Sequence, residues 1–569
     1  MRSNAIETKG QSDWLTTDWQ TVNRNVRNLR RRIFRAEQEG NHRKVKNLQK
    51  LMLRSQSNTL QSVRRVTEIN AGKQTAGVDK VVVSTAKEKG KLVDLLSTAE
   101  PWRAKPARRV YIPKANGKQR PLGIPTVLDR CLQAKVKNAM EPQWEARFEA
   151  SSYGFRPGRS AHDAITAIYN ITSNWRGRKK WVVDADIKGA FDNINHDFVL
   201  NAIKDTPGHE LVKQWLKAGV MENGKFQDTE AGTPQGGVIS PLLANIALHG
   251  MESALSIRRS PGREAVLGPR SVVRYADDFV VFCESQEDAE TSKQILSNWL
   301  AKRGLELSEE KTRITHLSIG FDFLGFNVRE YPSNRRKKGS SVLIKPSKKT
   351  ILRIKDKLRK IWLDMAGKDA DDVCMKLNPI MRGWANYFRV GVSSAAFSYL
   401  DHWMNYRAIR YVNRTHPNKS TSWRMAKYFG KRNKKSSDKW VFGLKYSPYF
   451  LLRFGWIGIE RHVMVKGSAS PDNAQLKDYW AIRQRKVSQL NRFQQRLAAT
   501  QNYKCPVCGD RLLNGEELHE HHMILDKTLK ERSDMKNIRL VHKLCHQQIH
   551  SSSKRDTPLS ARKLLIEAP

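Results

Sequence analysis

Hydrophobic residues in the first part of the chain recur every three or four positions, which is the spacing that places side chains on one face of an α-helix. Two such faces precede and follow Gly40: Val26, Leu29 and Ile33, then Val45, Leu48 and Met52. Cations are concentrated on the other side: Arg30, Arg31, Arg32, Arg35, Arg43 and Lys44. We therefore expect basic helices over residues 18–66 that contact a nucleic-acid backbone, although a solvated helix face would show the same pattern.

Two later segments predict strands that end in acids. Residues 272–282 read Val-Val-Arg-Tyr-Ala-Asp-Asp-Phe-Val-Val-Phe, so β-branched runs flank the pair Asp277 and Asp278. This pattern predicts a strand, a tight turn and a strand, with both carboxylates at the tip. Residues 181–191 predict another strand, which ends in an acid at Asp186.

These acids have a chemical implication. Clustered carboxylates repel one another and hold protons unless a cation cancels their charge. Two Mg²⁺ ions roughly 4 Å apart do so, and such a pair clamps the attacking and leaving oxygens of a phosphoryl displacement. The pattern thus indicates nucleotide polymerisation, whereas the plain alternative is two surface turns with exposed acids.

Segments between the two acidic strands and before them fit the same chemistry. Residues 108–125 predict a β-hairpin bearing cations, of which Lys114 and Arg120 can meet a triphosphate, arginine through its planar fork. Gln235 and Gly236 belong to a glycine-rich loop that enters a helix. There the backbone can lie close to a base pair, because glycine has no side chain.

The chain after residue 334 is strongly basic. A linker at 335–339 comes first, and a second helix is predicted to start at Pro379. Between them an amphipathic helix is marked by Ile351, Ile354, Leu358 and Ile361. Residues 420–466 interleave cations with aromatics, which suits phosphate contact and base stacking, although a small core with a wet basic face has the same composition. A polar linker helix is expected over 480–500.

Composition indicates the same kind of partner. The 569 residues include 102 Lys and Arg against 56 Asp and Glu, a formal net charge of +46. A chain of this length needs several domains, and cations spread along it indicate a polyanion, first of all nucleic acid. The sequence contains no apolar run of the roughly 18 residues that a transmembrane helix needs, and no signal-peptide stretch. We expect a cytoplasmic protein with no membrane partner.

Cysteine and histidine are concentrated near the C-terminus. Cys505-Pro-Val-Cys508 has the spacing of a zinc knuckle, and His542-Lys-Leu-Cys545 follows later. In a cytosolic chain such clustering favours a metal over disulfides. The four side chains suffice for a tetrahedral structural Zn²⁺ site, which would stabilise a small module; the alternative is cysteines with no shared role.

Taken in order, these segments resemble the reverse transcriptases encoded by group II introns of bacteria and organelles. Further stretches that carry the resemblance are Asn-Ala-Gly-Lys-Gln-Thr-Ala-Gly-Val-Asp at 70–79, Tyr-Gly-Phe-Arg-Pro-Gly-Arg-Ser at 153–160, Gly-Thr-Pro-Gln-Gly-Gly-Val-Ile-Ser-Pro-Leu-Leu-Ala-Asn at 232–245, Leu-Glu-Leu-Ser-Glu-Glu-Lys-Thr at 305–312 and Gly-Phe-Asp-Phe-Leu-Gly-Phe at 320–326. The resemblance implies that Asp186, Asp277 and Asp278 are the catalytic acids. Asp277 is the stronger metal ligand of the adjacent pair.

The resemblance also implies roles for neighbouring residues. Phe191, five residues after Asp186, would be the gate that excludes a ribose 2′-hydroxyl and selects deoxynucleotides. Asp184 shares a strand face with Asp186 and is expected to have a packing role. The deoxynucleotide site would consist of Lys114, Arg120, Phe191, Gln235 and Gly236.

The C-terminal module resembles the His-Asn-His nuclease found in many intron proteins. In that resemblance His522 is the general base and Asn537 orients its loop, and a histidine suits the base role near neutral pH. The ligands of a catalytic divalent metal would be His521, His546 and His550. The family's usual second pair is Cys-x-x-Cys, but here its first member is His542, which zinc also accepts. A degenerate module kept only for DNA contact is the alternative.

The implied fold is multidomain α+β: a right-hand reverse transcriptase with fingers and palm, an α-helical thumb, and a small ββα-metal nuclease module that contains zinc. The expected divisions are a basic extension at 1–69, fingers and palm at 70–335, a thumb or maturase domain at 336–415, a DNA-binding region at 416–490 and the nuclease at 491–569.

The implied function has several parts. The protein would bind its intron RNA in a ribonucleoprotein, promote splicing, nick target DNA, and extend the nicked end from dNTPs with the intron as template. Its cofactors would be two Mg²⁺ ions, a structural Zn²⁺ and a nuclease metal. The alternatives are a splicing factor without catalysis and a reverse transcriptase of a non-intron bacterial element.

Overall fold

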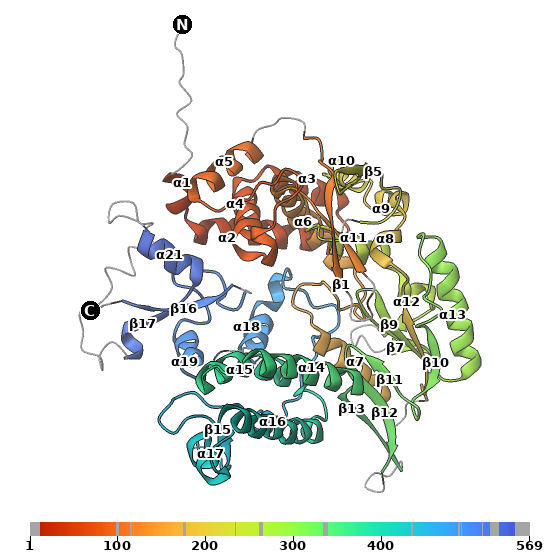
Figure 1. The fold of residues 1–569 in the computed structure, drawn as a ribbon. Helices are drawn as coiled ribbons and strands as arrows, with labels where there is room; N and C mark the ends of the chain where they lie inside the picture. The colour runs from red at the N-terminus through yellow and green to blue at the C-terminus, as the bar shows by residue number, and fades with distance from the viewer. Residues whose placement is uncertain are drawn as a thin grey trace.

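The computed structural model describes the following residues: 12–97, 102–113, 117, 119–173, 178–233, 235–260, 266–333, 339–433, 436–486, 490, 492–514, 516–523 and 534–551. Its N-terminal part is helical: α1 (Ser12–Leu15), α2 (Trp19–Gln38), α3 (His42–Arg54), α4 (Gln56–Arg64), the π-helical turn η1 (Arg65–Ile69), the 3₁₀ turn η2 (Ala71–Gln74) and α5 (Ala86–Ser97). Helices α2 to α5 pack on the long helix α6 (Val127–Arg147) (Figure 1).

The helical periodicity predicted for this region is confirmed. Asp18 caps α2 through Oδ1, which accepts hydrogen bonds from the backbone N–H groups of Gln20 and Thr21 at 3.0 and 3.2 Å. Asn41 caps α3 in the same way, and such caps satisfy donors that the first helical turn leaves free. All six predicted apolar positions on α2 and α3 are buried.

One cation of this region is not on the solvated side. The Nη2 atom of Arg30 lies 2.9 Å from Glu141 and 2.7 Å from Asp472, in side chains that are mostly buried. The prediction that Arg30 belongs to the exposed cationic face is therefore wrong. Acids from α6 and from a segment far along the chain pair with its guanidinium.

A four-stranded sheet stands beside these helices and forms the fingers. Its strand order is β2-β1-β4-β5. The strands are β1 (Ala107–Pro113), β2 (Gln119–Ile124), β4 (Val220–Glu222) and β5 (Lys225–Gln227). The antiparallel pairing of β1 with β2 places Ile112 opposite Arg120 and confirms the predicted hairpin.

A second four-stranded sheet, antiparallel throughout, forms the palm. Its strand order is β10-β3-β9-β8. The strands are β3 (Trp181–Asp186), β8 (Ser271–Tyr275), β9 (Asp278–Cys283) and β10 (Arg313–His316). Alternate residues face opposite cores: Val183 and Val281 pack in one hydrophobic cluster, whereas Val182 and Phe282 pack in another. Both faces of the sheet are covered, which explains its almost continuous apolar runs.

Helices and short strands surround the palm sheet. They are α7 (Ala161–Thr172), α8 (Ala190–Asn193), α9 (His196–Ala202), α10 (His209–Lys217), α11 (Ser240–Ala247), α12 (Met251–Ala254), β6 (Arg258–Arg259), β7 (Val266–Leu267) and α13 (Gln286–Ala301). Helix α13 contacts β3 and β9 on one face, and α7 contacts β8. The predicted glycine-rich loop does enter a helix, α11.

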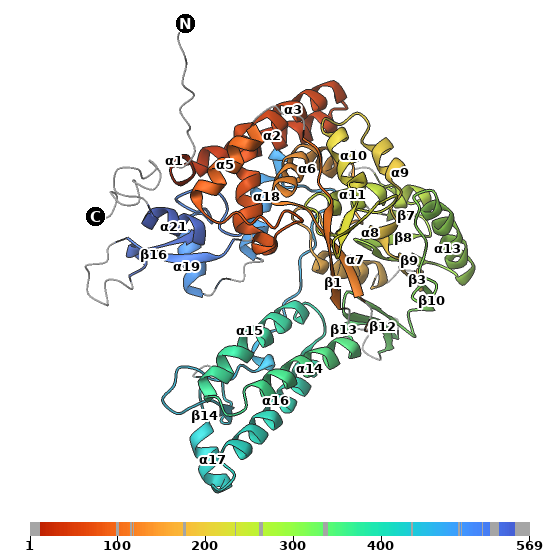
Figure 2. The ribbon, with the colours of Figure 1, turned by 45° about the horizontal axis from the view of Figure 1, so that its top comes forward.

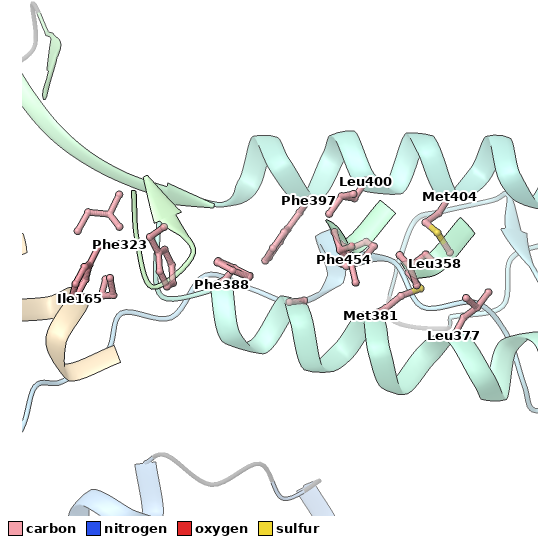
Figure 3. Packing of buried hydrophobic residues seen from close by; sticks show 14 of the residues in the cluster. Ile165, Phe323, Leu358, Leu377, Met381, Phe388, Phe397, Leu400, Met404 and Phe454 are labelled. Atoms are coloured by element: carbon pink, nitrogen blue, oxygen red, sulfur yellow. The ribbon is translucent and has the colours of Figure 1, made fainter. Parts of the chain in front are cut away.

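The thumb is a set of long helices that projects away from the palm (Figure 2). A three-stranded sheet of β11 (Phe321–Phe323), β12 (Phe326–Pro332) and β13 (Ser340–Pro346) leads into α14 (Lys348–Asp364), α15 (Ala370–Phe388) and α16 (Ser394–Thr415). Figure 3 shows Leu358, Met381 and Leu400 meeting between these helices. The same cluster reaches Ile165 on α7, so the thumb core is continuous with the palm core.

The second thumb helix begins earlier than the sequence predicts. Pro379 lies inside α15, which starts at Ala370. Val373, Leu377 and Met381 are all buried, so one apolar face runs through the proline. This packing outweighs the loss of one backbone hydrogen bond at the proline. Of the predicted linker 335–339, only Gly339 is among the described residues.

The segment after the thumb contains little regular structure. It comprises α17 (Thr421–Tyr428), β14 (Phe429–Gly430), β15 (Val441–Phe442), η3 (Phe454–Trp456), η4 (Ala474–Leu476) and α18 (Lys477–Lys486). Tyr428 and Phe442 are buried and stack in parallel, with ring centroids 6.0 Å apart. Trp440 and Tyr446 are 60% and 90% exposed. Both interpretations of the aromatics therefore hold in part: some form a small core and others lie on the basic surface.

The predicted polar helix over 480–500 is wrong. The chain forms two helices, α18 and α19 (Arg492–Thr500), and is not helical at Leu490 between them. Helix α18 is anchored rather than solvated, because Trp480 is buried and the Nη2 atom of Arg483 lies 2.6 Å from Oδ1 of Asp163 on α7. One face of α18 is buried, although the mixed composition of the helix does not indicate this.

The C-terminal module packs beside the N-terminal helices, as both ribbon views show (Figures 1 and 2). It contains α19, the antiparallel pair β16 (Leu518–His522) and β17 (Ile538–His542), η5 (Met535–Asn537) and α21 (Lys543–Ser551). Among the described helices of the whole chain, none combines the length and apolar character that a membrane crossing requires.

Candidate functional sites

Three acids meet at one end of the palm sheet. Asp186, the last residue of β3, is the register partner of Asp278, the first residue of β9. Asp277 lies in the two-residue turn between β8 and β9, where the flanking β-branched runs predict a turn. Ala276 completes this turn with a φ of +59°, a left-handed conformation that is uncommon for a residue with a side chain.

Residues 151–155 pack against the backbone of the acidic turn. The N–H of Tyr153 donates to the carbonyl of Arg274 at 2.9 Å, and the N–H of Arg274 donates to the carbonyl of Ser151 at 2.9 Å. A Cβ on Gly154 would lie 2.2 Å from the backbone nitrogen of Ala276. Glycine is required there because the two backbones touch, which fixes the turn that carries Asp277.

Burial and repulsion from neighbouring carboxylates raise the pKa values of Asp277 and Asp278. Burial first, and then the charges of Asp277 and Asp186, raise the pKa of Asp278 to about 7. Burial and the charge of Asp186 also raise the pKa of Asp277. Negative charge is therefore concentrated at a site with few internal cations, and the residues fit divalent ions that would cancel it.

Lys311 is a cation in direct contact with this cluster. Its Nζ atom donates a 2.6 Å hydrogen bond to Oδ2 of Asp186. This hydrogen bond is the main reason that the pKa of Lys311 is raised. Lys311 belongs to the 305–312 segment, but nothing in that segment's pattern predicted the contact.

Asp184 lies one pleat back from Asp186. Burial first, and then the charge of Asp322, raise the pKa of Asp184 to about 7, against an opposing effect of Arg313. It is the register partner of Arg313 on β10, and the charge of Asp186 also acts on it.

The residues predicted to bind the deoxynucleotide differ in their burial and in their contacts. Phe191 is half-buried on α8, with its ring edge-on to Phe155 and their centroids 6.0 Å apart. Arg120 is exposed on β2, and its charge lowers the proton affinity of Asp277. Lys114 lies outside the described residues.

Gln235 and Gly236 make contacts within the protein. The Nε2 atom of Gln235 donates to both carboxylate oxygens of Asp192 at 3.1 Å. A Cβ on Gly236 would lie 2.7 Å from the carbonyl oxygen of Gly123 on β2. The glycine-rich loop thus packs against the fingers hairpin. This close packing requires glycine at position 236, a requirement that the sequence did not predict.

The four predicted zinc ligands form one buried cluster. The Sγ atoms of Cys505, Cys508 and Cys545 and a ring nitrogen of His542 all lie within 4.8 Å of one another. Burial opposes ionisation, yet hydrogen bonds from the other thiols and from the imidazole lower the pKa of Cys505 well below its usual value. Such a tetrad of three sulfurs and one imidazole fits a tetrahedral metal ion.

The imidazole of His542 is oriented by a hydrogen bond to a residue outside the cluster. Nδ1 of His542 lies 3.3 Å from Sγ of Cys508, and Nε2 lies 3.0 Å from the carbonyl oxygen of Arg511. Burial works against protonation, but hydrogen bonds to Cys505 and Cys545 raise the pKa of His542 to about 11. A carbonyl on the far nitrogen is the usual partner of a metal-bound histidine.

A second cluster gathers the three histidines predicted to hold a nuclease metal. One ring nitrogen from each of His521, His546 and His550 lies within 4.8 Å of the others. His521 is buried and neither of its ring nitrogens has a hydrogen-bond partner among the described residues. Burial, then the nearby imidazoles, lower its pKa to about 4. A neutral imidazole with unpartnered nitrogens fits a metal ligand.

The remaining nuclease residues lie on the adjacent strands. His522 ends β16 beside His521 and is half-buried. It is the register partner of Ile538, which directly follows Asn537, and the carbonyl of Asn537 accepts a 2.9 Å hydrogen bond from the N–H of Met523. The structure thus brings His522, Asn537 and the three-histidine cluster into one ββα unit.

Comparisons with known families agree with this geometry. Residues 112–328 match the model of the reverse transcriptase (RNA-dependent DNA polymerase) family, and residues 14–96 match its N-terminal domain. Residues 351–429 match the maturase-specific domain of group II introns, and residues 505–552 match the HNH endonucleases. Fold and sites together define a reverse transcriptase that carries a maturase domain and a nuclease.

Two curated relatives are similar over most of their length. Protein YkfC of Escherichia coli is 36% identical over 316 residues, which cover 49% of this chain and 82% of YkfC. The group II intron-encoded protein LtrA of Lactococcus lactis is 30% identical over 430 residues, which cover 61% of this chain and 71% of LtrA. The chain belongs to the family of group II intron-encoded reverse transcriptases and maturases.

The structure of a telomerase from Candida albicans also matches, at 12% identity over 55% of this chain and 59% of that chain. Its TM-score of 0.31 is too low to support a conclusion. Membership of the intron family makes this protein multifunctional: it has reverse transcriptase, maturase and HNH endonuclease domains. Such domains use divalent metal ions and bind intron RNA and other nucleic acids.

Proposed function

We propose that the protein copies its intron into a DNA target that it has itself nicked, using the intron RNA as template and dNTPs as substrate. The observation that carries the polymerase step is the register of Asp186 against Asp278, with Asp277 in the adjoining turn. Three carboxylates from two strands gather at one sheet end. A protein that only bound RNA would gain nothing from the electrostatic cost of that cluster.

In the polymerase site, Asp186 and Asp277 are proposed to hold two Mg²⁺ ions, with Asp278 as the weaker ligand. The bound ions would stabilise the negative charge on the attacking 3′-oxygen and on the leaving pyrophosphate. Arg120 and Lys114 would bind the triphosphate on the fingers side. Phe191 would contact the sugar of the nucleotide and exclude a 2′-hydroxyl.

Gln235 and Gly236 complete the proposed deoxynucleotide site in an indirect way. The loop that contains them is tied to the fingers hairpin by a 2.9 Å hydrogen bond from the N–H of Gly123 to the carbonyl of Gln235. This tie would set the distance between the triphosphate-binding hairpin and the acids. The two residues would therefore shape the pocket around the nascent base pair.

The thumb and the segment after it are proposed to bind nucleic acid. Residues 336–415, the proposed thumb or maturase domain, place lysines and arginines of α14 on the exposed side of a helix whose other face is buried. Residues 416–490 expose Trp440, Tyr446 and Tyr449 among cations. Aromatic faces and cations together suit single-stranded DNA near the cut site.

The C-terminal module, residues 491–569, is proposed to nick the DNA. Cys505, Cys508, His542 and Cys545 would hold a structural Zn²⁺ ion, and His521, His546 and His550 a catalytic divalent ion. His522 would take a proton from the attacking water, and Asn537 would hold the loop that positions it. Neutral His521 is ready to bind metal without first losing a proton.

A target-primed assay tests this account. The protein is assembled with its intron RNA and given double-stranded DNA that contains the insertion site, dNTPs and Mg²⁺. We expect a nick in one strand, followed by extension of that new 3′ end with intron complementary DNA. Extension from added primers without any nick would contradict the nuclease part, and nicking without extension would contradict the polymerase part.

A further inference from the structure

The nuclease module is not a free appendage in this structure. Its metal-site residues Cys505, Cys508 and Cys545 belong to one hydrophobic cluster with Trp19 and Val63 from the N-terminal helices. Gln548 of α21 donates from Nε2 to the carbonyl oxygen of Leu15 at 2.8 Å. The knuckle also touches α2, since a Cβ on Gly509 would lie 2.9 Å from the side chain of Gln20.

One residue of the N-terminal helices reaches the metal site itself. Arg64, the last residue of α4, has a side chain that is only 4% exposed. Its Nη2 atom donates to Oε2 of Glu516 at 3.0 Å and lies 3.8 Å from Sγ of Cys545. The guanidinium also stacks on Trp19, with its Cζ atom 4.6 Å from the ring centroid.

The chemistry of the cluster explains why a cation belongs there. Three thiolates exceed the charge of a divalent ion by one, so the occupied site is an anion in a buried place. A buried anion is costly unless a cation or donor lies beside it. Groups that donate to metal-bound ligands from the second layer commonly change metal affinity by about 10- to 100-fold.

We propose that Arg64, a residue of the polymerase's N-terminal helices, is an outer-sphere partner of the metal in the nuclease module, so that metal binding and docking of the module stabilise each other. The proposal rests on the cysteine–histidine site binding a metal ion. Reciprocity follows from linkage: if docking tightens metal binding, then the metal tightens docking by the same factor. The nuclease would thereby be held at a fixed position relative to the polymerase.

The test measures zinc retention in the full-length protein. Zinc bound per chain is determined first, and its transfer to an excess of a colorimetric chelator is then followed in time. We expect Arg64→Ala to release zinc at least about tenfold faster than the wild type, and Arg64→Lys to show an intermediate rate because it keeps a charge but loses the fork. Arg65→Ala, which removes the exposed neighbouring arginine, is the matched control and should release zinc like the wild type.

A double substitution separates the thiolate contact from the Glu516 ion pair. If Arg64 acts only through Glu516, Arg64→Ala should have no further effect in a Glu516→Gln background. We expect it still to accelerate zinc release there, because the contact with Cys545 remains to be lost. Docking is followed in parallel by limited proteolysis, in which Arg64→Ala should free the module sooner, and chelation of the wild type should do the same.

Primer extension on an annealed RNA template shows that the variants are folded, since Arg64 contacts Glu516, Cys545 and Trp19 rather than the polymerase acids. Equal zinc release by wild type, Arg64→Ala and Arg64→Lys would overturn the proposal, as would a module that stays equally docked with and without zinc. A wild-type protein that holds no zinc would instead overturn the metal assignment itself. These two failures are therefore distinguishable.

Discussion

Lys311 and Asp186 form a 2.6 Å ion pair at the edge of the acidic cluster, with the lysine side chain 63% exposed and the aspartate side chain 20% exposed. The ammonium lies beside Asp186, the acid of the cluster that comes from β3. A divalent ion bound by Asp186 would compete with this ammonium for the same carboxylate.

This competition predicts the effect of Lys311→Ala on metal dependence. An exposed ion pair contributes about 0.2–1 kcal/mol, so its removal should lower the Mg²⁺ concentration for half-maximal primer extension by up to about fivefold. Lys188→Ala, which removes an exposed pair with Glu306, is the control and should leave that concentration unchanged. A higher Mg²⁺ requirement in Lys311→Ala would show that the lysine does not oppose the metals.

The raised pKa of Asp278, about 7, predicts how pH acts on the metal-free protein. The folded chain keeps a proton that the unfolded chain, with an aspartate pKa of about 3.9, has already lost. This stabilisation is present at acid pH and disappears as the pH rises through about 7.

With chelator present, the midpoint of thermal unfolding of the wild type should therefore fall between about pH 4 and about pH 7. Asp278→Asn should show a smaller fall, and Asp197→Asn, an exposed acid on α9, should behave like the wild type. Added Mg²⁺ should reduce the fall in the wild type. A midpoint that rises with pH in the metal-free wild type would contradict the geometry of the acids.

The histidine cluster predicts separate loss of the two activities. His521→Ala removes a buried residue of the proposed metal cluster, and His522→Ala removes the proposed general base, so both should abolish DNA nicking while primer extension continues. His519→Ala is a matched control, because its ring lies beside His546 but outside the three-ligand cluster. Loss of primer extension together with nicking would mean that the module is structural for the whole chain.

Phe191 predicts sugar discrimination. Phe191→Ala should raise the use of ribonucleotides relative to deoxynucleotides by about 10- to 200-fold, the range that a steric contact worth about 1–3 kcal/mol supports. The measurement compares kcat/KM for a ribonucleotide and its deoxynucleotide on one primer and template. Unchanged discrimination would remove the gate role from Phe191.

The parts of the sites that could be predicted from sequence are those built from neighbouring residues. The turn at Asp277 follows from the β-branched runs on either side of it, and the helix that pairs His546 with His550 follows from their spacing. The cysteine and histidine pairs at 505–508 and 542–545 carry a metal-ligand spacing that needs no knowledge of the fold. Short-range rules were sufficient in each case.

The parts that could not be predicted depend on partners far along the chain. Arg30 was expected on a solvated face because its acid partner Asp472 comes from a distant segment. Arg483 was placed in a polar linker for the same reason, although it pairs with Asp163. The start of α15 was missed because its buried face, visible only in the packed thumb, outweighs the local signal of Pro379.

The measurement that tests the central claim most directly is primer extension on an annealed RNA template with dNTPs and Mg²⁺, comparing the wild type with Asp277→Ala. The account predicts extension by the wild type and its loss in Asp277→Ala, with intron RNA binding equal in both. Equal extension by the two proteins would contradict the assignment of the acids. No extension by either, with tight intron RNA binding retained, would contradict the polymerase and leave a splicing factor.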